Sequence, residues 1–110
     1  MTYQHQELAA GRWNELALME QLGHVGSEVE RALKWRGKNN PGFSMNAVDR
    51  ALELLDLTIA APGNRLRLKE LCRSREVVVD FFCGENQYPS SEESLRAYFF
   101  HFACAARLAR

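Results

Sequence analysis

Arg96 and His101, near the end of the chain, are the residues whose types could do chemistry together. Imidazole titrates at about pH 6.5 and can act as a general acid or base, and guanidinium binds phosphate oxygens in a bidentate fork. The two residues form an R-x4-H pattern within a segment, 94–106, that is otherwise mostly apolar. These residue types are compatible with chemistry on a phosphate, but the interpretation that we favour is an ordinary, partly buried histidine and a surface arginine.

The spacing of this pair limits how it could work. Five positions correspond to about 140° of rotation around an α-helix, so Arg96 and His101 flank one helix face and are not stacked on one line. A site would need the arginine side chain to curl round the helix. Alternatively, a dimer axis could bring the arginine of one chain near the histidine of the other.

The helix that carries the pair is predicted to be apolar on two sides. One narrow face, which must pack on the rest of the domain, consists of Leu95, Phe99, Phe102 and Ala106. The opposite face consists of Ala97, Phe100, Cys104 and Leu108. Because a four-helix monomer cannot bury both sides, the second face predicts a homo-oligomer interface or a surface for a partner protein.

An R-x4-6-H pattern on the last or penultimate helix of a small all-α domain resembles the HEPN superfamily (higher eukaryotes and prokaryotes nucleotide-binding). The resemblance covers the segment from Arg96 to His101 and the helical outline, and Ala97 stands where the family often has Asn or Asp. It implies a dimeric, metal-independent ribonuclease with Arg96 and His101 as catalytic residues. A role in a toxin–antitoxin or nucleotidyltransferase-associated system is also implied.

The outline of the chain is also similar to the four-helix-bundle proteins encoded by 23S rRNA intervening sequences, and to the accessory variability determinant proteins of retroelements. This similarity consists of chain length, helix number and a small-residue stretch, 21–27, on a long first helix. It implies an oligomeric, nucleic-acid-associated bundle without catalytic residues.

Apolar residues recur at intervals of three or four along most of the chain, as one face of a helix requires. The predicted helices span approximately residues 8–36, 45–61, 65–83 and 91–109, with Ser44 and Asn64 as N-caps and a capping box from Ser90 to Glu93. Gly23 and Gly26 are predicted to mark a close approach of a neighbouring backbone, or else a kink. The sequence thus predicts a single all-α domain, 1–110, folded as an up-and-down antiparallel four-helix bundle.

Cations concentrate at the end of the first predicted helix and along the third. The candidate nucleic-acid-binding residues in these stretches are Arg31, Lys34, Trp35, Arg36, Lys38, Arg73 and Arg75. In an antiparallel bundle the ends of these two helices share one pole, where the cations could bind phosphates and Trp35 could stack on a base of RNA or DNA. Alternatively, the cations complement the helix dipole and solvate an exposed face.

Composition narrows the remaining functions. Fourteen basic residues balance fourteen acidic ones, so no overall field recruits a charged partner. The three cysteines form no C-x-x-C pair and no histidine pair has ligand spacing, so we predict no metal and no cofactor. The sequence has no signal-peptide pattern and no run of about 20 apolar residues, which predicts a cytoplasmic protein without a membrane span.

Overall fold

The computed structural model describes residues 11–108, with the side chains of residues 102, 103 and 105–108 outside that description. The described chain is all-helical and contains no strand, which confirms the all-α part of the prediction. Its elements are η2 (Trp13–Glu15), α1 (Leu18–Gly37), α2 (Pro41–Ala60), η3 (Pro62–Arg67), α3 (Leu68–Cys83) and α4 (Glu92–Leu108). Within residues 11–108, no helix is both long enough and apolar enough to cross a membrane.

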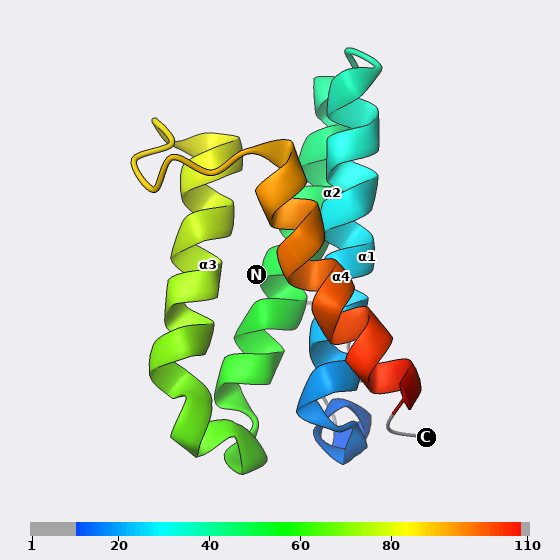
Figure 1. Ribbon diagram of the computed structural model, residues 1–110, viewed down its shortest axis with the longest axis vertical. Helices are drawn as coiled ribbons and strands as arrows, with labels where there is room; N and C mark the ends of the chain where they lie inside the picture. The colour runs from blue at the N-terminus through cyan, green and yellow to red at the C-terminus, as the bar shows by residue number, and fades with distance from the viewer. Residues whose placement is uncertain (1–10, 109–110) are drawn as a thin grey trace.

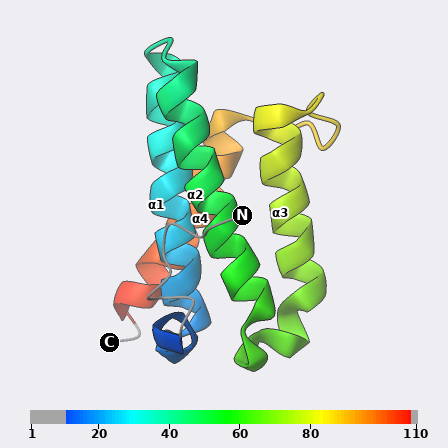
Figure 2. The same cartoon turned by 180° about the vertical axis from the view of Figure 1, so that it is seen from behind.

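The helices α1 and α2 lie side by side along their lengths and form a hairpin (Figures 1 and 2). The helix α3 stands on the other side of α2, and α4 crosses the face of the hairpin diagonally (Figure 1). The turn between α1 and α2 extends beyond the ends of α3 and α4 (Figure 1). The molecule therefore presents a projecting hairpin tip and one helix, α4, laid across its side.

The first α-helix begins at Leu18, later than the predicted start near residue 8, which lies outside the described residues. Leu16 and Ala17 have extended backbone, with ψ of 144° and 153°, so the chain turns between η2 and α1. The cause is Trp13, which is 1% exposed and whose Nε1 donates a hydrogen bond to Thr58 Oγ1 at 3.1 Å. Anchoring this indole on α2 breaks the helical path before α1.

The second helix begins at Pro41, because Asn40 Oδ1 accepts a hydrogen bond from the backbone N of Phe43 at 3.0 Å. Proline suits the first helical position, since its fixed φ is helical and it has no N–H to satisfy. The prediction of Ser44 as the cap was wrong. Ser44 is buried inside α2 and its Oγ donates to the carbonyl of Ala32 on α1 at 2.8 Å.

The third helix begins at Leu68, and the prediction of Asn64 as its cap was also wrong. Asn64 lies buried in η3, and its Nδ2 donates to Gln21 Oε1 at 2.8 Å and to the carbonyl of Thr58 at 2.9 Å. Gln21 in turn donates to the carbonyl of Trp13 at 2.8 Å. This buried polar network ties η2, α1, α2 and η3 together, because each of its members would be costly to leave unpaired.

The fourth helix begins at Glu92, close to the predicted start near Ser91. Its capping box lies one residue later than predicted. The backbone N of Ser94 donates to Ser91 Oγ at 3.0 Å, and the backbone N of Ser91 donates to Ser94 Oγ at 2.9 Å. Leu95 and Phe99, expected on the inner face of α4, are each 3% exposed. The side chains of Phe102 and Ala106, expected on that same face, lie outside the described part.

Gly26 lets α4 approach α1. A Cβ atom built at Gly26 would lie 2.7 Å from Phe99 Cβ, a distance that real Cβ contacts do not show. The predicted close approach of a neighbouring backbone is therefore confirmed at Gly26. The residues that form the main core with Phe99 include Leu22, Val25, Val29, Leu33, Leu54, Leu55, Leu71, Val78 and Leu95.

We expect Gly26→Ala to destabilise the fold by up to about 2 kcal/mol, because the usual cost of overpacking a core, about 1–3 kcal/mol, exceeds the gain of about 1 kcal/mol in helix propensity. Urea unfolding followed by circular dichroism measures this free energy. Gly37→Ala is the matched control, because Gly37 also lies in α1 but has no atom within 4 Å of an added Cβ. A Gly26→Ala variant as stable as the Gly37→Ala variant would contradict the close approach.

Candidate functional site

Two of the three residues described on the outer face of α4 are exposed. Phe100 is 65% exposed and Ala97 is exposed, while Cys104 is half-buried. The side chain of Leu108, the fourth residue predicted on this face, lies outside the described part. Since each residue of a helix turns about 100°, packing Phe99 into the core directs Phe100 towards solvent. A large aromatic ring is thus left uncovered.

A groove of about 400 Å³ runs between α1 and α4, next to this face. Phe100 contributes to its lining, so the exposed ring and the groove belong to one continuous surface. The other lining residues are Gly23, Gly26, Ser27, Val29, Glu30, Leu95, Arg96 and Phe99. The groove is thus lined by small residues of α1, of which Gly26 is packed against Phe99 and the other two leave space. Its charged residues are Glu30 and Arg96, which form an ion pair.

Arg96 is engaged with carboxylates. Its Nε lies 2.9 Å and 3.2 Å from the two carboxylate oxygens of Glu30 on α1, and its Nη1 lies 3.6 Å from Glu92 Oε1. His101 is exposed, and in the described part of the chain no hydrogen bond or ion pair joins it to Arg96. The structure thus places the two candidate catalytic residues on either side of Phe100 without bringing them together.

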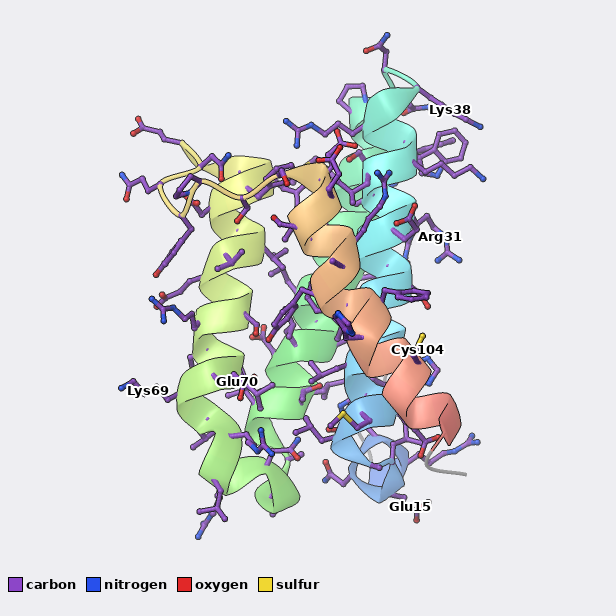
Figure 3. The ribbon with its side chains drawn as sticks, viewed as in Figure 1. Glu15, Arg31, Lys38, Lys69, Glu70 and Cys104 are labelled. Atoms are coloured by element: carbon purple, nitrogen blue, oxygen red, sulfur yellow. The ribbon has the colours of Figure 1, made fainter. Side chains whose placement is uncertain are left out.

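Several of the candidate nucleic-acid-binding cations already have partners. Arg31 Nη1 lies 2.6 Å from Glu28 Oε1, and Arg75 Nε lies 2.7 Å from Asp56 Oδ1. These partners sit on α1 and α2, away from the hairpin tip. The three candidate cations at the end of α1 are Lys34, Arg36 and Lys38. Figure 3 shows Lys38 at the tip, with Arg31 projecting from the side of α1 below it.

A side chain near the end of α1 contacts a ring near the end of α3. Arg36 Cζ lies 4.6 Å from the ring centroid of Phe81, near the end of α3. The α3 cations point elsewhere, however, because Arg73 Cζ lies 5.8 Å from the ring centroid of Tyr88 in the loop before α4. The contacts therefore assign Arg73 and Arg75 to other surfaces and leave the α1 cations as a separate group.

Phe43 is a residue of the tip that sequence reasoning missed. Its ring is 52% exposed and packs edge-on against Trp35, with the ring centroids 4.9 Å apart at 79°. Lys38 Nζ lies 5.3 Å from the Trp35 ring centroid. The Asn-Pro signal of an N-cap followed by a first helical residue could have placed Phe43 on α2 instead of in a loop.

A cavity of about 260 Å³ lies between α3 and α4. No sequence pattern predicted it. The hydroxyls of Ser74 and Tyr98 share a hydrogen bond of 2.6 Å in its lining, and burial raises the pKa of the Tyr98 phenol. Tyr88 donates to Glu76 Oε2 at 2.7 Å, and this hydrogen bond raises the pKa of Tyr88. Both phenols therefore stay neutral and serve as hydrogen-bonding groups.

The described residues contain no metal-binding cluster and no disulfide. Among those residues, no three His, Cys, Asp or Glu side chains come together in a group that could hold a metal ion. Cys72 and Cys83 are exposed, Cys104 is half-buried, and all three are free thiols. No protein-family model, curated protein or solved structure matches the chain. A function must therefore be inferred from the surfaces of this chain itself.

Proposed function

We propose that this chain is a non-enzymatic cytoplasmic module, an up-and-down antiparallel four-helix bundle that associates with itself through the outer face of α4. The observation that carries the proposal is Phe100, which is 65% exposed beside a groove of about 400 Å³. Three free cysteines suit a reducing compartment. The occupant that we propose for the groove is a second copy of the chain.

A ring and a groove on the same surface support a twofold dimer. In a twofold interface the same patch is used by both chains, so the Phe100 ring of each chain could enter the groove of the other. Full burial of a phenylalanine side chain stabilises by roughly 1.5–3 kcal/mol, and the symmetry doubles that gain. Gly23 and Ser27 leave room for the incoming ring, because one has no side chain and the other a small one.

The charges on this surface are self-complementary as well. Glu30 is 56% and Arg96 41% exposed at the side chain, so both ends of their ion pair border the groove in contact with solvent. Across a twofold axis, the arginine of each chain would face a surface that also carries a carboxylate. In such a dimer each Arg96 and each Glu30 would keep a partner of opposite charge. An interface needs this because unpaired buried charges are costly.

We expect the wild-type chain to form a dimer that dissociates on dilution, and Phe100→Ser to shift it to the monomer by removing the buried ring. Sedimentation velocity over a range of micromolar concentrations measures both states. Phe43→Ser is the matched control, because Phe43 is also an exposed phenylalanine but lies at the hairpin tip. A wild-type chain that stays monomeric, or a Phe100→Ser variant that dimerises like wild type, would contradict the proposal.

A second candidate function is a metal-independent ribonuclease of the HEPN type. The observation in its favour is that Arg96 and His101 are both exposed and flank Phe100, so the proposed dimer would gather two copies of each at one interface. His101 would act as the acid or base and Arg96 would hold the phosphate. Arg96 would first have to leave Glu30, which makes the non-enzymatic module the better supported of the two.

For this candidate we expect RNA cleavage by the wild-type chain in the presence of a chelator, and its loss in His101→Ala and Arg96→Ala. Gel analysis of a labelled RNA follows the cleavage. His24→Ala is the control, since His24 is also an exposed histidine but lies on α1. The ribonuclease candidate is eliminated if the wild-type dimer leaves RNA intact, or if His101→Ala cleaves as fast as His24→Ala.

A further inference from the structure

The hairpin tip concentrates positive charge without acidic residues. Residues 31–48 contain four cations and no aspartate or glutamate. Arg31 forms an ion pair with Glu28, which also pairs with Arg50. Among the described side chains, no carboxylate forms an ion pair with Lys34, Arg36 or Lys38, and all three are exposed. The end of α1 thus carries three cations that the fold leaves available.

The dipole of α1 does not account for this concentration. The C-terminus of an α-helix carries roughly half of one negative elementary charge, so one cation in the last turn already complements it. The last turn of α1 contains Lys34 and Arg36, and Lys38 follows at its cap. Within the described part, no carboxylate offsets the surplus of about two and a half positive charges, because Arg36 and Lys38 contact aromatic rings only; the surplus is suited to an external anion.

An exposed aromatic ring packs against Trp35 at this end of α1. Phe43 is 52% exposed although it is a large apolar side chain, and Trp35 supports it edge-on. Lys38 covers the ring of Trp35, which leaves Phe43 as the ring presented to solvent. An exposed ring and cations therefore occur together at the hairpin tip, which projects from the rest of the molecule (Figure 1).

We propose that this tip, defined as Lys34, Trp35, Arg36, Lys38 and Phe43, binds single-stranded nucleic acid. A base would stack on Phe43, and the cations would contact the phosphates on either side of it. Unpaired bases present their flat faces to such a ring, whereas a duplex keeps its bases stacked inside. An acidic peptide would use the cations and leave the ring without a matching group. The single strand is therefore the ligand that uses every member of the tip.

The tip contains its own reporter of binding. Trp35 contacts Phe43, so a base stacked there changes its surroundings and its fluorescence. The other tryptophan, Trp13, is 1% exposed and lies beyond the opposite end of α1, a helix of 20 residues or about 30 Å. Fluorescence of Trp13 therefore provides a constant background, and any change on titration reports on the tip.

The test is a titration of the full chain with a short oligo(U), a short oligo(dT) and a DNA duplex of the same length, in a series of salt concentrations. We expect either or both single strands to bind more tightly than the duplex and to change the Trp35 fluorescence. The affinity should fall with salt with a logarithmic slope of about −2, since each phosphate contact by a cation contributes about −0.7 on single strands. Phe43→Ala should weaken binding by about fivefold or more.

Matched variants distinguish binding at the tip from non-specific attraction to any lysine, and from effects of self-association through α4. Lys34→Ala should reduce the salt slope by about 0.7, whereas Lys69→Ala should leave it unchanged. Lys69 is exposed on α3, away from the hairpin tip (Figure 3). Phe100→Ser should retain the wild-type affinity to within about twofold, because a short strand engages one tip only. If the chain does not self-associate, binding of a short single strand at the tip is therefore still expected.

Four outcomes would overturn the inference. One is the absence of binding to any single strand at low salt. Another is a duplex, or an acidic peptide of equal charge, that binds as tightly as the single strands. The third is a Phe43→Ala variant with wild-type affinity, and the fourth is a Lys69→Ala variant weakened as much as Lys34→Ala. Circular dichroism of each variant confirms that the helices are retained.

Discussion

The contact between Gly26 and Phe99 determines which side of α4 faces the core. With no side chain at Gly26, α1 accepts the Phe99 ring against its backbone, and Phe99 becomes 3% exposed. The rotation of the helix then directs Phe100, the next residue, outward, where it is 65% exposed. The same contact lines the groove between α1 and α4. The core packing of α4 and its proposed interface are therefore consequences of one constraint.

The two proposed surfaces lie on different parts of the fold and leave each other accessible. The tip belongs to the end of α1 and the start of α2, whereas the self-association surface belongs to α4 and the middle of α1 (Figure 1). A dimer formed through α4 would thus display two tips, and linking two binding sites raises the apparent affinity for a strand long enough to reach both. On this account the module gathers single strands, and assembly and binding support each other.

The helices and their inner faces could be predicted from the sequence, because the spacing of Leu95 and Phe99 and of other apolar residues is a local property. The roles of Ser44 and Asn64 could not, since their partners Ala32 and Gln21 lie 12 and 43 positions away. In the candidate site, too, local features could be predicted from the sequence and tertiary contacts could not. Periodicity predicted the outer face of α4, whereas the pairing of Arg96 with Glu30, 66 positions away, depends on tertiary packing. Phe43 was missed because the start of α2 was placed too late.

The central claim is that a second copy of the chain covers the outer face of α4, and the reactivity of the cysteine thiols tests it most directly. Cys104 lies on that face, whereas Cys72 and Cys83 are exposed on α3. The measurement is the rate at which a small thiol reagent modifies each cysteine, determined by mass spectrometry over a range of protein concentrations. The account predicts that Cys104 reacts more slowly as the concentration rises, while Cys72 and Cys83 keep constant rates. A Cys104 rate that does not change with concentration, or protection of Cys72 and Cys83 in its place, would contradict it.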